Sequence, residues 1–245
     1  MIKIIIPLGG TSELFANAGY YYPKPLIEVN GNTMIETVLK NPQSINLKKQ
    51  IIFIVKEDDC IKFHLDNTLK ILSENCIIIK IKQDTQGGLC SVLLSVDYIN
   101  DEDEILILNG DQIIDYSFSE ILKFWKDHNA DAGIIIFKSV HPRWSYAKIL
   151  NEKVIETAEK NPISNNAIAG VYYFKNSKMF FSSAFSTIKN DIQVNGNYYI
   201  SSVLNEYVLK NNVIIPFKIN NTNYHSFYSP QVLQEYERKV TNGKI

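Results

Sequence analysis

The stretch that decides the fold is Ile4-Ile5-Ile6-Pro7-Leu8-Gly9-Gly10-Thr11-Ser12, close to the N-terminus. Three consecutive isoleucines, bounded by a proline and a glycine pair, are typical of a buried strand. The glycines let backbone N–H groups approach an anion with no side chain in the way. Because α/β proteins bind nucleotides where such a strand ends, we expect a nucleotide here. Short glycine motifs also occur by chance, so an ordinary strand and turn is the alternative.

Two further residues suggest phosphate chemistry. Lys24 stands between Pro23 and Pro25, which stiffen the backbone around this one cation. Asp111 follows the apolar run 105–108 in an Asn-Gly-Asp sequence, which puts its carboxylate at the carboxyl edge of the sheet. A carboxylate there suits Mg²⁺ that bridges phosphates. The alternatives are a surface lysine and an aspartate in a turn or helix cap.

Composition excludes several classes of protein. The 245 residues are 45% hydrophobic and 21% charged, and the formal net charge is −1. This balance fits a globular protein with an ample core and no polycationic face for nucleic acid. The three cysteines are widely spaced, without a CxxC pair, so neither a zinc site nor a disulfide framework is indicated. No window approaches the roughly 18 apolar residues of a membrane span. We therefore expect a soluble, reduced, cytoplasmic protein.

Strand and helix patterns alternate through the first half of the chain. Strands are predicted at 51–55, 76–81 and 105–108, and helices at 33–40, 59–72 and 89–99. The first of these helices begins at Thr33, with Glu36 in the capping-box position. This rhythm predicts a parallel, doubly wound sheet with right-handed crossovers.

The pattern changes beyond residue 131. Strands are predicted at 134–137, 168–174 and 213–217, a hairpin at 146–150 and 154–157, and helices at 177–188, 199–210 and from 230. Gly170 lies inside one of these strands, often a sign that a ligand approaches the backbone closely. We predict one mixed α/β domain over 1–245, in which 1–130 and 131–245 bind different ligands.

Four stretches, taken together, resemble the sugar-phosphate nucleotidyltransferases, or nucleotide-sugar pyrophosphorylases, of bacterial capsule and surface-polysaccharide pathways. The stretches are 7–10 with 23–29, 83–92, 109–112, and 144–174. Their order and spacing match over nearly the whole chain. The resemblance implies a Rossmann-like, mostly parallel sheet flanked by helices, of the GT-A type. It also implies that 1–130 binds the nucleotide and that 131–245 forms a small lobe for a sugar phosphate.

The resemblance implies a reaction as well. An oxygen of a sugar or polyol phosphate attacks the α-phosphorus of a nucleoside triphosphate, and pyrophosphate leaves, with Mg²⁺ as cofactor. Such chemistry depends on positioning and charge neutralisation more than on covalent help from the protein. A homo-oligomer is an open possibility. Neither the base of the nucleotide nor the acceptor is fixed by the residues.

Site residues follow from the same resemblance. Lys24 would contact the α-phosphate, Asp111 would hold the metal ion, and Lys160 would bind the incoming phosphate. The residues expected along the nucleotide are Leu8, Gly9, Gly10, Thr11, Gln83 and Gly88. Those expected in the second-substrate pocket are Tyr146, Glu159, Gly170, Asn197 and Tyr198. From the residues alone, the tyrosines are better explained as core and the lysines as surface.

The chain departs from the family pattern in two places. Ser12 and Leu14 stand where the family has a glycine and the arginine that grips pyrophosphate, and Glu13 adds a negative charge. Near the C-terminus, Ser226 lies in the stretch where the family usually has a second metal-binding aspartate. Leucine cannot replace the arginine, because it carries no charge and no N–H fork.

Three hypotheses therefore stand. The first is an active nucleotidyltransferase, helped by a cation such as Lys3 or Arg143 or by a partner chain. The second is a non-catalytic relative that binds a nucleotide or sugar phosphate as a regulatory subunit. The third is a glycosyltransferase, which would need a second acid two residues from Asp111, where the chain has Asn109 and Ile113.

Overall fold

Strand β1 (Ile2–Pro7) lies inside a nine-stranded sheet, between β4 (Lys49–Lys56) and β6 (Glu104–Leu108). Both neighbours run parallel to it, and β5 (Ile77–Ile81) continues the parallel order beyond β4. The computed structural model describes residues 1–243 of the chain. The predicted parallel sheet of the first half is confirmed.

The second half extends the same sheet, mostly with antiparallel strands. Its strands are β8 (Ala132–Lys138), β9 (Ser145–Leu150), β10 (Lys153–Glu159), β11 (Asn166–Phe174) and β12 (Ile214–Lys218). Strand β11 pairs antiparallel with β6, so the sheet runs without a break from one half into the other. The predicted hairpin is confirmed: Asn151 and Glu152 at its turn both have positive φ, as tight hairpin turns require.

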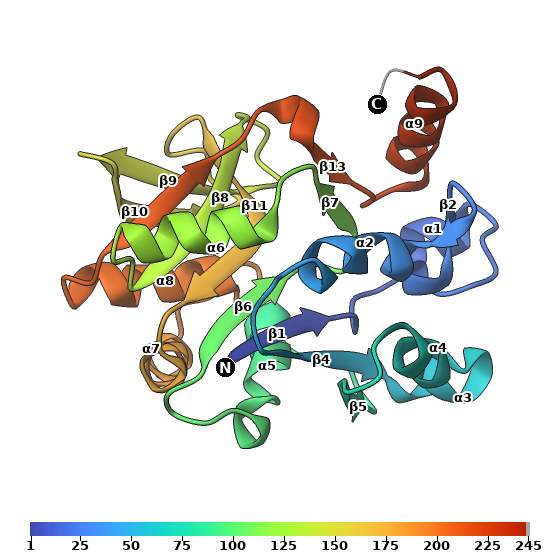
Figure 1. Cartoon of the computed structure of the whole chain (residues 1–245), viewed down its shortest axis with the longest axis horizontal. Coiled ribbons are helices and arrows are strands. Elements are labelled where there is room, and N and C mark those ends of the chain that lie inside the picture. The colour runs from blue at the N-terminus through green and yellow to red at the C-terminus, as the bar shows by residue number, and fades with distance from the viewer. Residues whose placement is uncertain (244–245) are drawn as a thin grey trace.

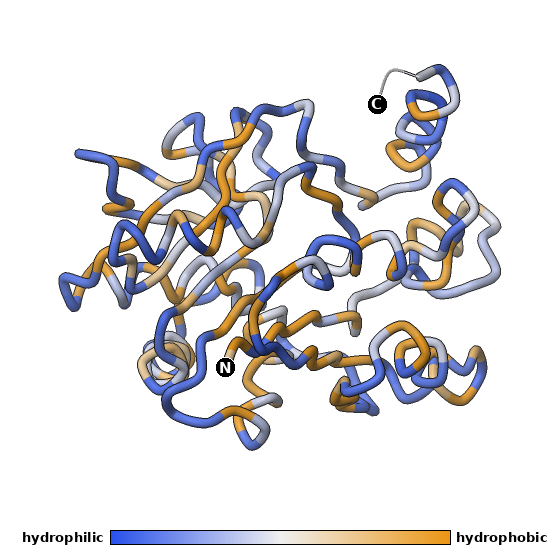
Figure 2. The backbone as a smooth tube through the Cα atoms, viewed as in Figure 1, coloured by the Kyte–Doolittle hydropathy of each residue, from blue (hydrophilic) through white to orange (hydrophobic). Residues whose placement is uncertain are grey.

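Helices cover both faces of the sheet (Figure 1). One face carries α2 (Met34–Gln43), α3 (Glu57–Phe63), α4 (Leu65–Leu72) and α6 (Phe118–Asp127), and the other α5 (Gly88–Leu93), α7 (Ser177–Lys189) and α8 (Ile200–Leu209). The isoleucines of β1 alternate between the two cores: Ile4 and Ile6 pack toward the first set and Ile5 toward the second. Apolar residues follow the central strands through the interior (Figure 2).

A smaller layer of structure closes the end of the sheet where β1 stops. It contains α1 (Glu13–Asn17), the 3₁₀ turns η1 (Lys24–Leu26) and η3 (Asn221–Asn223), strands β2 (Glu28–Val29), β3 (Asn32–Thr33), β7 (Gln112–Ile114) and β13 (Tyr224–Ser226), and α9 (Pro230–Thr241). A third core cluster holds this layer together, including Phe15, Ile113, Phe227 and Leu233. Because β13 pairs with β7, residues near the C-terminus lie beside the strand that follows Asp111.

Several helix predictions need correction. The helix expected at 59–72 is divided at His64, which has the left-handed conformation (φ 54°, ψ 36°). The helix expected at 89–99 ends at Leu93 and is followed by a 3₁₀ turn, Val96–Tyr98. The capping box of α2 is confirmed, since the Thr33 hydroxyl accepts from the Glu36 N–H and the Glu36 carboxylate accepts from the Thr33 N–H. Among residues 1–243, no helix is long and apolar enough to cross a membrane.

Gly87 joins the two halves at a close backbone contact. The Tyr198 N–H donates to the Gln86 carbonyl at 2.9 Å, and the Leu89 N–H donates to the Tyr198 carbonyl at 3.1 Å. A Cβ on Gly87 would lie 2.4 Å from that same carbonyl oxygen, and the residue has φ +96°. Only glycine combines this conformation with this approach.

Replacing Gly87 by alanine is therefore expected to lower the free energy of unfolding by about 2–3 kcal/mol. The neighbouring Gly88→Ala is the matched control, because its new Cβ would meet only Ile200 Cδ1, at 4.0 Å. Gly88 is the first residue of α5, so the control should stay within about 1 kcal/mol of the wild type. Denaturant unfolding measures the free energy of unfolding of both variants. Equal stability of the two would contradict the claim that the Gly87–Tyr198 contact requires glycine.

Candidate active site

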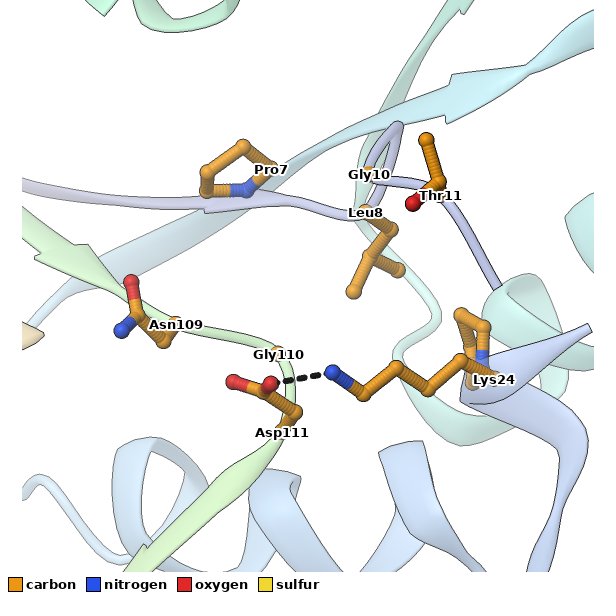
Figure 3. Close-up of a pocket in the computed structure, with 9 residues that line it drawn as sticks. Pro7, Leu8, Gly10, Thr11, Lys24, Asn109, Gly110 and Asp111 are labelled. Carbon is orange, nitrogen blue, oxygen red and sulfur yellow. Dashed lines mark hydrogen bonds and ion pairs between the residues drawn. The ribbon is translucent and has the colours of Figure 1, made fainter. Parts of the chain in front are cut away.

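A cavity of about 260 Å³ opens where β1 and β6 end. Its wall combines the glycine loop, the Pro-Lys-Pro turn and the Asn-Gly-Asp turn, and Figure 3 shows how their side chains face it. The lining residues are Pro7, Leu8, Gly10, Thr11, Lys24, Pro25, Asn109, Gly110 and Asp111. The structure therefore brings together three stretches that the sequence singled out separately, at the edge where α/β sheets bind their ligands.

Lys24 and Asp111 form an ion pair across this cavity (Figure 3). Their side chains are 21% and 24% exposed, so the pair is partly withdrawn from water but open to a ligand. The Lys24 backbone N–H donates to the Ser12 hydroxyl at 3.0 Å, which fixes the turn against the glycine loop. An anion that enters would find the ammonium group already oriented, and a cation would find the carboxylate.

Asp111 is also fixed from the C-terminal side. Its carbonyl accepts from the Phe227 N–H at 2.7 Å, and Ser226 pairs with Gln112 in the β7–β13 ladder. Ser226 therefore lies beside Asp111, in the place where the resemblance implies a second aspartate. In the part of the chain that the structure describes, no group of three or more His, Cys, Asp or Glu side chains could hold a metal ion.

The loop beyond Thr11 supplies no cation. Glu13 and Leu14 form the exposed first turn of α1, and Leu14 is 58% exposed. The hypothesis that Lys3 compensates is wrong: Lys3 is buried in the sheet, where its ammonium donates to Gln50 at 2.7 Å and lies 3.9 Å from Asp103.

Three predicted nucleotide-binding residues lie outside the cavity lining. Gly9 packs against Ile81, since a Cβ on it would lie 2.6 Å from Ile81 Cδ1. Gln83 is exposed in the loop that follows β5, and Gly88 begins α5. The end of β5, from which this loop starts, lies next to the glycine loop through the Gly9–Ile81 contact.

The predicted phosphate-binding Lys160 lies at the end of β10, beside α8. Its ammonium donates to the Tyr199 hydroxyl at 2.8 Å and lies over that ring, and the side chain is exposed. The adjacent Glu159 accepts from the Ser145 hydroxyl and, at 2.8 Å, from the Ser201 hydroxyl. Burial raises the pKa of the Glu159 carboxyl, and the two serine hydroxyls partly oppose this rise. Glu159 is thus a half-buried acceptor, held in position by the chain itself.

The other predicted pocket residues are engaged within the protein. Tyr146 is fully buried, and its hydroxyl donates to the His141 carbonyl at 2.6 Å, so its ring lines no open cavity. Asn197 and Tyr198 lie in the segment that meets Gly87, where the Tyr198 hydroxyl donates to Asp191 at 2.6 Å. Tyr198 is half-buried there.

The interior Gly170 lies in close contact with another part of the chain. It has φ +63°, and a Cβ on it would lie 2.2 Å from the Asn109 side-chain nitrogen. Asn109 therefore makes one close approach to this glycine, and binding of a substrate beside Gly170 stays a prediction. The same Asn109 side chain turns away from Asp111 (Figure 3).

Several residues of the site gave no signal in the sequence. Ser12, Ser145, Ser201 and Tyr199 bind the predicted residues through hydroxyl groups. Single hydroxyls have no spacing pattern, so only the fold reveals them. Asn109 and Gly110, by contrast, stand in the Asn-Gly-Asp sequence itself and could have been included as lining residues.

The comparison with known proteins decides the family. A family model described as nucleotidyl transferase matches residues 3–220. The chain belongs to this family. It is 25% identical over 181 residues to a mannose-1-phosphate guanylyltransferase catalytic subunit beta of Dictyostelium discoideum, a match covering 71% of this chain and 49% of that protein. It is 23% identical over 235 residues to the bifunctional protein GlmU of Limosilactobacillus reuteri, covering 91% of this chain and 49% of that protein.

Nucleotidyl transferases of known structure share the fold. The crystal structure of a nucleoside-diphosphate-sugar pyrophosphorylase from Vibrio cholerae RC9 superposes with a TM-score of 0.85 at 24% identity, over 96% of this chain and 99% of that one. The predicted mixed, mostly parallel sheet flanked by helices is confirmed by this likeness and by the strand pairing. The chain spans about half the length of the curated relatives that it matches.

Proposed function

We propose that the protein transfers a nucleotidyl group from a nucleoside triphosphate to the phosphate of a sugar or polyol, for capsule or surface-polysaccharide synthesis. The observation that carries the proposal is the facing pair Lys24 and Asp111 on the cavity beside the glycine loop. Membership of the nucleotidyl transferase family supports the class of reaction. Relatives named for sugar-1-phosphate substrates support the class of acceptor.

In this reaction one bond forms and one breaks at the α-phosphorus. An oxygen of the acceptor phosphate bonds to it, and the bond to the oxygen that bridges the β-phosphorus breaks, so pyrophosphate leaves. The Lys24 ammonium offsets negative charge on the α-phosphate, and backbone N–H groups of the glycine loop do the same along the nucleotide. Lys160 binds the incoming phosphate, and Glu159 accepts hydrogen bonds from the acceptor. We infer that residues 1–130 bind the nucleotide and 131–245 the acceptor.

The residues around Asp111 fit Mg²⁺ that is held mainly by the nucleotide. Among the residues that line the cavity, Asp111 is the one with a carboxylate, and the nearby Ser226 could contribute a hydroxyl but no charge. Mg²⁺ commonly takes one or two carboxylates and completes its shell with phosphate oxygens and water. When bound, such an ion supplies charge neutralisation for the triphosphate. Asp111 would hold this ion, which would replace the Lys24 ammonium as the partner of its carboxylate.

A second candidate function is nucleotide or sugar-phosphate binding without turnover. Two observations favour it. Exposed Glu13 and Leu14 provide no cation that could bind pyrophosphate, and Ser226 provides no second carboxylate for a metal ion beside Asp111. A glycosyltransferase finds no support. Asn109 turns away from Asp111, and Ile113 is buried in the third core cluster.

The experiment is a matrix of CTP, UTP, dTTP, GTP and ATP against sugar 1-phosphates and polyol phosphates, with Mg²⁺ present. Release of pyrophosphate that requires both substrates supports the proposal. Each nucleotide alone is the control for hydrolysis. Nucleotide binding without release for any pair supports the second candidate.

A further inference from the structure

Arg143 is a cation next to the site for which neither the family pattern nor the cavity lining gives a role. Its guanidinium carbon lies 3.8 Å from the centre of the Tyr228 ring and 4.6 Å from that of Trp144. The side chain is exposed and makes no ion pair with any of residues 1–243. The chain has two arginines, Arg143 and Arg238. Two aromatic rings therefore position an arginine that pairs with no carboxylate in the described part of the chain.

Two backbone hydrogen bonds connect the surroundings of Arg143 to the predicted metal site and to the predicted phosphate site. On one side, the carbonyl of the adjacent Trp144 accepts from the Lys160 N–H at 3.0 Å. On the other, Tyr228 directly follows Phe227, whose N–H donates to the Asp111 carbonyl at 2.7 Å. The Tyr228 ring, which packs on the Arg143 guanidinium, thus belongs to the residue next to the one that bonds to Asp111. The two residues whose rings hold Arg143 are therefore connected through the backbone to Lys160 on one side and to Asp111 on the other.

Tyr224 also connects the strand that follows Asp111 to Trp144. Its hydroxyl donates to Gln112, the residue after Asp111, at 3.3 Å, and its ring centre lies 5.7 Å from that of Trp144. Burial and the Asp111 carboxylate raise the pKa of Tyr224, while Arg143 opposes the rise.

This position suits a phosphate group. A guanidinium that stacks on aromatic rings keeps its N–H edge free for phosphate oxygens, and the stacking limits the entropy lost on binding. Reaction requires the acceptor phosphate to lie roughly 3–3.5 Å from the α-phosphorus. The acceptor phosphate must then lie between the Lys24–Asp111 pair and Lys160. The two rings that hold Arg143 belong to residues connected to both of these places, because Trp144 bonds to Lys160 and Tyr228 follows Phe227, which bonds to Asp111.

We propose that Arg143 binds the phosphate of the acceptor together with Lys160, held in position by the rings of Tyr228 and Trp144. The identity of this phosphate as the acceptor's rests on the proposed function. The placement of an anion beside Arg143 does not. The family pattern has its arginine on the glycine loop, where it grips pyrophosphate, whereas in this chain Arg143 would supply a charge to the second substrate.

The test compares Arg143→Ala with Arg238→Ala, which removes the other arginine from the exposed surface of α9. Titration calorimetry measures binding of inorganic phosphate and of mannose 1-phosphate to the full chain. Arg143→Ala should weaken both by at least about tenfold, as expected for a lost charge-assisted pair. Arg238→Ala should leave both unchanged. Nucleoside triphosphate affinity should change less than twofold in either variant.

Two further variants separate binding from folding. Arg143→Lys keeps the charge but not the fork, so its affinity should fall between those of the wild type and Arg143→Ala. Tyr228→Leu should weaken phosphate binding several-fold, because it removes the ring that holds the guanidinium in position and leaves the charge of Arg143 unchanged. Thermal unfolding of each variant confirms that the chain is folded.

Kinetics then distinguish this proposal from the function itself. With an active substrate pair, Arg143→Ala should raise the KM for the acceptor and leave the KM for the nucleotide unchanged. Equal phosphate binding by the two arginine variants, or none by the wild type, overturns the role of Arg143. If no pair of substrates releases pyrophosphate but phosphate binding still depends on Arg143, the proposed function fails and this assignment stands.

Discussion

Replacing Asp111 by asparagine is expected to lower the rate of pyrophosphate release by at least about a thousandfold. The change removes the one carboxylate of the cavity lining and keeps the shape of the side chain. The backbone contact between the Asp111 carbonyl and the Phe227 N–H is unaffected by it. The chain should therefore remain folded while the charge that would hold Mg²⁺ is lost.

Two measurements check this result. Steady-state assays give the rate, and nucleotide titrations with and without Mg²⁺ test the metal separately from turnover. In the wild type Mg²⁺ should tighten nucleotide binding, and in Asp111→Asn it should not. Asp127→Asn is the control, because Asp127 is exposed on α6 and forms a surface ion pair with Lys123. Retained turnover in Asp111→Asn would remove the metal role from Asp111.

Replacing Lys24 by alanine is expected to lower turnover by about two to three orders of magnitude, through loss of a cation that acts on the charge of the transition state. The change leaves the partly buried Asp111 carboxylate without its partner, so some loss of stability is expected and has to be measured separately from the loss of turnover. Turnover assays and thermal unfolding measure the two effects.

Lys62→Ala is the matched control for Lys24, since Lys62 is 65% exposed and its ion pair with Asp58 is on the surface. The control should be as active as the wild type. A loss under tenfold in Lys24→Ala, equivalent to about 1.4 kcal/mol, would be too small for contact with the α-phosphate.

Local patterns were enough to predict the centre of the fold. The isoleucines of β1 are buried on both faces, as the run of apolar residues predicts for a strand in a parallel sheet covered on each side. Thr33 and Glu36 predict the start of α2 because a capping box is a contact between residues three apart. The same locality explains why Lys24 and Asp111 could be singled out: each stands in a short motif, Lys24 in the Pro-Lys-Pro turn η1 and Asp111 in the Asn-Gly-Asp turn after β6.

Long-range contacts account for most of what the sequence did not predict. The strand pair of β7 and β13 joins residues more than a hundred positions apart, and strands of three residues have too little pattern to recognise. That pair places Ser226 and Tyr228 near Asp111. The division between α3 and α4 at His64 was missed because histidine is not a usual helix terminator. Tyr146 was assigned to a pocket by resemblance, whereas its bond to the His141 carbonyl fixes it in the core.

The most direct test of the central claim is to identify both products of the wild-type chain with its best substrate pair, by phosphorus NMR. Nucleotidyl transfer predicts equal amounts of pyrophosphate and a nucleoside diphosphate linked to the acceptor, formed only when both substrates and Mg²⁺ are present. A tightly bound nucleotide that stays unchanged beside every acceptor phosphate would contradict the claim. It would make this chain a binding member of the nucleotidyl transferase family.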